Sequence, residues 1–141
     1  MDEFISETVQ IRRRAEHVYA LLADMSFFAQ AVASAQFGEQ MKDIEDFRSD
    51  RDSCSFKVKG VDVGIQIIDR EPFKTIKYTG CGQIPFNFFI WIQLKELAPD
   101  DTRMRIVLHA KLNLMMKAMF KNKIKTGINQ IANQLANSLN A

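Results

Sequence analysis

Hydrophobic and polar residues alternate with a period of two through the middle of the chain, from about residue 39 to residue 112. Successive side chains of a β-strand point to opposite faces, so this alternation predicts strands with one apolar face. Turn-forming stretches such as Gly80-Cys81-Gly82 and Pro99-Asp100-Asp101 separate the strands. The gaps are short, which predicts hairpins and an antiparallel sheet that is covered on one face only.

The chain before this region changes period twice. Residues 4–11 read as a strand with two open registers, one of which points Thr8 and Gln10 inward. From Ala15 the apolar residues recur at spacings of three and four, which predicts a short helix. Ser26 is placed to cap a second short helix with the sequence FFAQAVAS.

The last segment, residues 113–139, is predicted to form one long amphipathic helix, because its apolar residues step by three or four throughout. Such a helix must bury its apolar stripe, and the concave face of the sheet is the large surface available for it. Small Gly127 is expected to allow close approach to the sheet or to a ligand. We therefore expect a single α+β domain over residues 1–141, with about seven antiparallel strands wrapped around this helix.

Three stretches resemble the START/Bet v 1-like superfamily, also called SRPBCC or polyketide cyclase-like. They are AEHVYALLADMSFF, REPFKTIKY and IPFNFFIWIQL. Within the superfamily, the chain is similar to a group of uncharacterised Bacteroidetes proteins. It departs from that group at Arg12–Arg14, where a proline and a serine helix cap are usual. The first helix is thus left without an evident cap, and basic charge stands where it opposes the helix dipole.

The resemblance implies a helix-grip fold and a cavity between sheet and long helix that binds a small hydrophobic molecule. Plain core packing is the alternative for the same residues. Tyr78 is the best polar anchor, because a buried phenol needs a partner, which a ligand carbonyl, a water or a backbone carbonyl can supply. The expected ligand contacts have inward parity on the strands or lie on the helix stripe: Phe56, Val58, Ile65, Ile67, Tyr78, Phe88, Ile90, Ile92, Met104, Ile106, Leu108, Met116, Phe120 and Ile124.

The sequence favours binding over catalysis. His17 and His109 fall on polar faces, and Cys54 reads as a small core residue. No acidic residue has clear inward parity on the central strands, and general acid–base catalysis needs such a group in the cleft. We expect no metal and no cofactor. A cyclase- or dehydratase-like enzyme remains the third hypothesis, after ligand binding and an interaction module.

An uneven charge distribution supports the interaction module. Residues 1–101 carry 12 Lys/Arg against 17 Asp/Glu, a net charge of −5, and residues 102–141 carry seven Lys/Arg and no acid. Lys117, Lys121 and Lys125 share one helix face and could meet phosphates of a membrane surface or RNA, although a solvated face is the simpler reading. The segment lacks interleaved exposed aromatic residues, which speaks against nucleic acid.

Two aromatic residues mark a second candidate surface. Phe89 and Trp91 have outward parity, which suits a partner surface or a homodimer. Met115, Met116 and Met119 open the long helix and read either as a gate to the cavity or as core packing.

Composition and cysteine content indicate the class of protein and its cellular compartment. The chain is 47% hydrophobic and 26% charged, which is typical of a folded globular domain and excludes disorder. Its two cysteines make no disulfide framework, and the acidic start is unlike a secretory signal. We expect a cytoplasmic protein.

Overall fold

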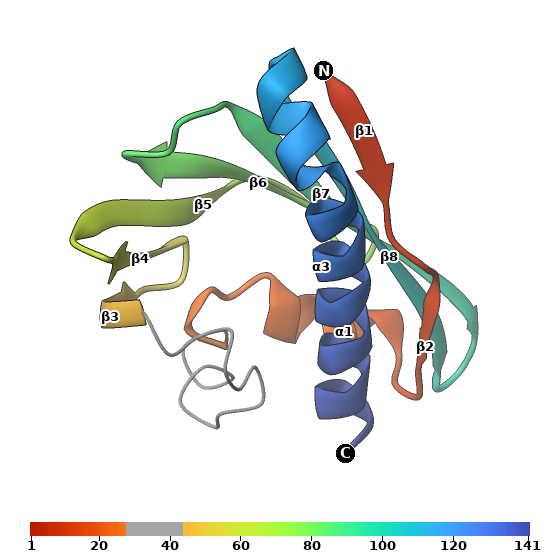
Figure 1. The fold of residues 1–141 in the computed structure, drawn as a ribbon. Helices are drawn as coiled ribbons and strands as arrows, with labels where there is room; N and C mark the ends of the chain where they lie inside the picture. Colours follow the sequence, from red (N-terminus) through yellow and green to blue (C-terminus); the bar gives the residue numbers. More distant parts are fainter. Residues whose placement is uncertain (28–43) are drawn as a thin grey trace.

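A computed structural model describes residues 1–27 and 44–141 of the chain (Figure 1). Within these ranges the strands are β1 (Asp2–Ile5), β2 (Val9–Ile11), β3 (Ile44–Ser49), β4 (Ser53–Val58), β5 (Val61–Glu71), β6 (Thr75–Gly82), β7 (Phe88–Ala98) and β8 (Asp101–Ala110). The helices are α1 (Ala15–Leu22) and α3 (Leu114–Asn140). None of the described helices is long and apolar enough to cross a membrane. The predicted second helix lies outside the described residues, apart from Phe27.

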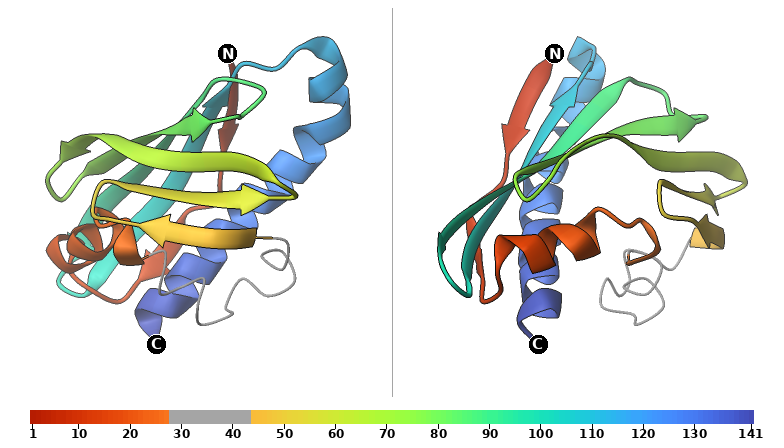
Figure 2. Two further views of the ribbon diagram at one scale, coloured as in Figure 1. Left: turned by 90° about the vertical axis from the view of Figure 1, so that its left-hand side faces the viewer. Right: turned by 180° about the vertical axis from the view of Figure 1, so that it is seen from behind.

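The strands form one antiparallel sheet in the order β1-β8-β7-β6-β5-β4-β3, and β2 also pairs with β8. The sheet curves around α3, and α1 lies beside the C-terminal half of that helix (Figures 1 and 2). This arrangement confirms the predicted α+β helix-grip fold. The long helix of residues 113–139 is found at Leu114–Asn140.

The prediction of a single strand at residues 4–11 is wrong in one respect, because this segment is divided between two strands, β1 and β2. At the break, the Ser6 hydroxyl accepts the backbone N–H of Ile106 at 2.8 Å, in place of the usual main-chain acceptor. Phe4 and Ser6 are buried before the break, and Val9 and Ile11 are buried after it. The inward parity therefore changes from even to odd positions, and Thr8 and Gln10 are both exposed.

Asparagine side chains of α3 bind the backbone of this broken edge. The Glu7 N–H donates to Asn129 Oδ1 at 2.7 Å, and the Arg12 N–H donates to Asn140 Oδ1 at 2.6 Å. The Asn140 amide in turn donates to the Gln10 carbonyl at 3.0 Å. These bonds fix the C-terminal half of α3 along β2.

The core lies between the sheet, α1 and that half of α3. The buried residues of α3 are Ile128, Ala132, Leu135, Ala136 and Leu139, all in its second half. They join Val18 and Leu22 of α1 in one hydrophobic cluster with the sheet.

The missing cap of α1 is supplied by the sheet. Arg14 occupies the N-cap position and makes no side-chain capping bond. Instead the Ala15 N–H donates to Glu96 Oε1 of β7 at 3.0 Å. The hydroxyl of Thr102, which is fully buried, donates to the Arg13 carbonyl at 2.7 Å. The β7–β8 hairpin thus holds the start of α1, and the Glu96 carboxylate suits the positive end of its dipole.

We predict that Glu96→Ala lowers the free energy of unfolding by about 1 kcal/mol, the usual effect of losing a helix cap. Glu96→Gln should lower the free energy of unfolding by less, because the glutamine side-chain oxygen still accepts the Ala15 N–H. Urea denaturation followed by circular dichroism measures both. Lys95→Ala on the same exposed strand end is the control, and an equal effect of Lys95→Ala and Glu96→Ala would contradict the cap.

Candidate functional site

The inner face of the sheet has a closed half. Its side chains are Ile67, Tyr78, Ile92, Met104 and Ile106, each 9% exposed or less. They belong to the cluster that packs against α1 and the C-terminal half of α3. These five of the expected ligand contacts are core residues in this structure, and their contact with a ligand remains a prediction.

The other expected contacts form an open half, in which apolar side chains keep part of their surface accessible. None of the α3 residues from Leu114 to Gly127 is buried, and Figure 2 (left) shows the first turns of α3 standing clear of the sheet. Phe120 is 37% exposed. The half-buried members are Phe56, Val58, Ile65, Phe88, Ile90, Leu108, Met116 and Ile124.

Two glycines lie beside the open half, Gly80 on β6 of the sheet and Gly127 on α3. A Cβ on Gly80 would lie 2.5 Å from the Phe88 ring and 2.8 Å from Ile84, so glycine lets both side chains lie over β6. A Cβ on Gly127 would have no described heavy atom within 4 Å. The expectation that Gly127 allows close approach to the sheet is therefore wrong. It borders open space on the helix face that it shares with Phe120 and Ile124.

Tyr78 has a backbone partner. Its hydroxyl donates to the Leu22 carbonyl at 3.0 Å, and the side chain is 3% exposed. Burial raises the pKa of the phenol far above its usual range, so it stays protonated at neutral pH. Of the three partners considered from the sequence, the structure provides the backbone carbonyl. This bond ties the end of α1 to β6 beneath the open half.

Of the titratable groups named from the sequence, the two histidines lie away from the open half, whereas Cys54 pairs across the strands with Ile65. His17 is exposed on α1, with ring nitrogens 3.3 Å and 3.4 Å from an Arg13 guanidinium nitrogen. His109 is on the outer face, 2.7 Å from Glu3 Oε2. Cys54 is buried, and desolvation raises the pKa of its thiol. Within residues 1–27 and 44–141, no group of three His, Cys, Asp or Glu side chains could hold a metal ion.

Phe89 and Trp91 lie on the outer face, as their parity predicts. Lys77 Nζ stands 4.7 Å from the Phe89 ring centre and 5.1 Å from that of Trp91. The Trp91 and His109 ring centres are 4.7 Å apart, edge to face. A shallow pocket of about 280 Å³ lies here, lined by Glu3, Ile5, Trp91, Gln93, Arg105, Val107 and His109. A role of this face in dimerisation remains a prediction.

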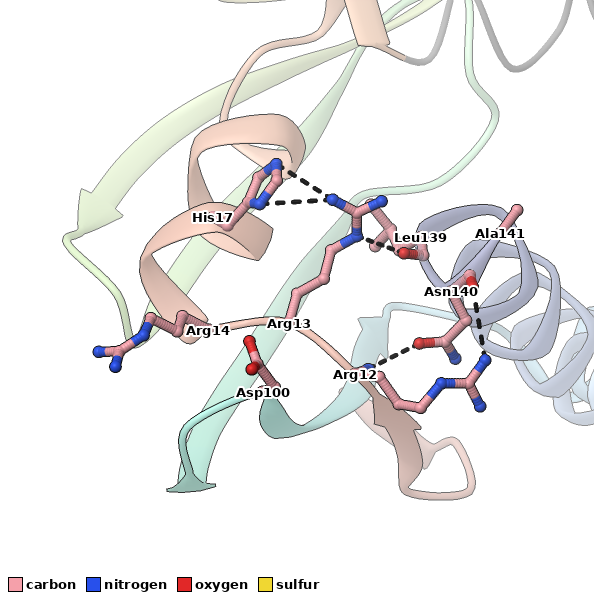
Figure 3. Close-up of a pocket in the computed structure, with 8 residues that line it drawn as sticks. All are labelled: Arg12, Arg13, Arg14, His17, Asp100, Leu139, Asn140 and Ala141. Atoms are coloured by element: carbon pink, nitrogen blue, oxygen red, sulfur yellow. Dashed lines mark hydrogen bonds between the residues drawn. The ribbon is translucent and has the colours of Figure 1, made fainter.

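A second pocket, of about 420 Å³, lies where the arginine triplet meets the end of α3 (Figure 3). The Arg13 guanidinium donates to the Leu139 carbonyl, and that of Arg12 donates to the Asn140 carbonyl at 3.4 Å. They satisfy carbonyls that a helix end leaves unpaired and offset the negative end of its dipole. Because α3 has no basic residue in its last turn, Arg12 and Arg13 supply this charge from the segment before α1. From the sequence, these arginines are expected only to oppose the dipole of the first helix, and their contact with the end of α3 depends on the tertiary fold.

Solved structures resemble the whole chain. Norcoclaurine synthase from Thalictrum flavum matches with a TM-score of 0.73 at 8% identity, covering 98% of this chain and 86% of its own. The di-domain ARO/CYC BexL from the BE-7585A biosynthetic pathway matches with a TM-score of 0.71 at 9% identity, covering 97% of this chain and 46% of its own. A conserved protein from Geobacillus kaustophilus matches with a TM-score of 0.68 at 14% identity, covering 99% of this chain and 95% of its own.

This chain shares their fold. No family model and no curated protein matches its sequence. At 8–14% identity, these structural neighbours show the fold of the chain.

Gly127→Ala should raise the free energy of unfolding by about 1 kcal/mol, because alanine favours the helix and its methyl group meets no described atom. Thermal and urea denaturation measure the change. Gly60 is the control, since its Cβ position is equally open but its φ is +82°. Gly60→Ala should therefore destabilise the protein, and a destabilising Gly127→Ala would show that the space is filled.

Tyr78→Phe should lower the free energy of unfolding by about 1–3 kcal/mol, because the buried Leu22 carbonyl loses its donor. Tyr19→Phe is the control, since the Tyr19 ring is half-buried and packs edge-on against Phe73 at 5.6 Å. Equal stability of the two variants in urea would contradict the anchoring role of Tyr78.

Proposed function

We propose that this protein binds a small hydrophobic molecule, such as a lipid, a sterol or a polyketide-like compound, without chemical conversion. The ligand would lie between the open half of the sheet and the N-terminal half of α3. The observation that carries this proposal is the division of one apolar face into a closed half and an open half. Among the described residues, the side chains of the closed half are buried, whereas those of the open half keep part of their surface accessible, although Phe56, Ile65 and Ile90 also pack against the core cluster.

Burial of the open half would give a useful binding free energy. Apolar surface removed from water contributes about 25 cal/mol per Å², so roughly 400 Å² gives about 10 kcal/mol before association costs. Association costs of at least about 4 kcal/mol leave a net value of about 6 kcal/mol or less, which corresponds to dissociation constants of roughly 40 μM or weaker. The described side chains of this half are aliphatic and aromatic, which supports a ligand held by shape and apolar contact.

The names of two structural neighbours support a small organic ligand. One is norcoclaurine synthase, and the other is a component of a biosynthetic pathway. As part of the same proposal, we place the chain in the SRPBCC superfamily, beside its Bacteroidetes members, and in the cytoplasm. The same names favour a cyclase- or dehydratase-like enzyme as the second candidate. The described part of the open half favours binding, because both histidines lie elsewhere and the Cys54 thiol beside Ile65 is buried with a raised pKa.

The test uses purified protein with the apolar dye Nile red as the probe, and mass spectrometry of solvent-extracted protein for co-purified compounds. Gly127→Trp should weaken dye binding at least tenfold, because the indole fills the open space. Thr126→Trp is the matched control, since it adds the same side chain at the neighbouring exposed position.

We expect Thr126→Trp to bind the dye like the original protein. Equal affinity of the original protein and Gly127→Trp, or a failure to bind dye together with extracts free of apolar compounds, would refute the proposal. Conversion of a bound compound by the purified protein would instead support the enzyme.

A further inference from the structure

The first two turns of α3 expose large apolar side chains to solvent. Leu114 is 88% exposed, Met115 is 73% exposed and Met119 is 60% exposed. We call these three residues the α3 tip. Scattered apolar residues are normal on a protein surface, but a cluster at the start of one helix marks an interaction surface.

The tip is distinct from the ligand surface on the same helix. Met115 and Met119 are four positions apart and therefore share one face of α3. Met116, Phe120 and Ile124 form another row, which is more covered and borders the open half. Substitutions at the tip can thus test one surface without altering the other.

The tip stands in the most basic part of the chain. Residues 102–141 contain no Asp or Glu, and five lysines lie within or beside the first half of α3: Lys111, Lys117, Lys121, Lys123 and Lys125. Lys117 Nζ pairs with Asp2 at 3.0 Å, so the lysine face predicted from the sequence is partly neutralised by β1. Lys121, Lys123 and Lys125 are exposed.

We propose that the α3 tip docks on the surface of an anionic phospholipid bilayer. The leucine and methionine side chains enter the boundary between headgroups and acyl chains, and the lysines contact headgroup phosphates. Unbranched methionine side chains adapt to a disordered apolar layer. Single-stranded nucleic acid would instead require stacking platforms, and the tip presents leucine and methionine.

The α3 tip and the open half both lie along the first half of α3. Docking of the tip would therefore place the open half beside the bilayer. A membrane would then be the source or the destination of the apolar ligand. This second step rests on the proposed function, whereas docking itself requires only the tip and the lysines.

The experiment is sedimentation of the protein with phosphatidylcholine vesicles, with and without phosphatidylglycerol. We expect binding to the anionic vesicles that falls as salt is added. The double variant Met115→Ser/Met119→Ser and the double variant Lys121→Glu/Lys123→Glu should each weaken this binding at least tenfold.

Matched controls lie on the β7–β8 hairpin. Leu97→Ser removes an apolar side chain that is 53% exposed, and Lys95→Glu reverses an exposed lysine. Both should bind vesicles like the original protein. All changed positions are exposed, and unchanged thermal unfolding will show that each variant is folded.

The two proposals fail separately. The lysine variant should retain Nile red binding, and Gly127→Trp should retain vesicle binding. No binding to anionic vesicles, equal binding to neutral and anionic vesicles, or full binding by the tip or lysine variants would overturn membrane docking while leaving the ligand proposal standing.

Discussion

The attachment of the C-terminal half of α3 to β2 is the constraint on which the rest of the structure depends. Asn129 and Asn140 bind the backbone of the broken edge, and Arg12 and Arg13 bind the last carbonyls of the helix. The buried side chains of α3 begin only at Ile128. The helix is longer than the surface that the core offers it. Fixing one half therefore leaves the other half, with its apolar stripe, beside an uncovered part of the sheet.

Most of the fold could be predicted because alternation reports directly which side chains share a sheet face. The inward parity of β4 to β8 follows from single residues such as Ile92 and Met104, which are buried as expected. The break at Ser6 could not be predicted, because it depends on a hydroxyl that reaches Ile106 in a strand 100 residues away. The cap of α1 was equally out of reach, since Glu96 approaches Ala15 only in the folded chain.

The candidate site shows the same limit. Ile106 and Leu108 follow the same alternation, yet Ile106 is 4% exposed and Leu108 is half-buried. The difference arises from the path of α3 over the sheet, which contacts at its far end determine. Lys117, Lys121 and Lys125 lie in the predicted helix, but the pairing of Lys117 with Asp2 joins segments more than a hundred residues apart. Periodicity identifies which residues are apolar or basic, whereas tertiary contacts decide which of them remain available.

The asparagines of α3 have one further consequence. Asn140 accepts from the Arg12 N–H and donates to the Gln10 carbonyl, so its side-chain amide pairs with β2 as the peptide group of another strand would. Asn129 makes one such bond, because its side-chain oxygen accepts the Glu7 N–H. Backbone groups at the edge of a sheet invite pairing with strands of other molecules, and natural proteins cover or block them. Here the side-chain amides of a helix occupy the backbone groups beside β2, which blocks the addition of another strand at this part of the edge.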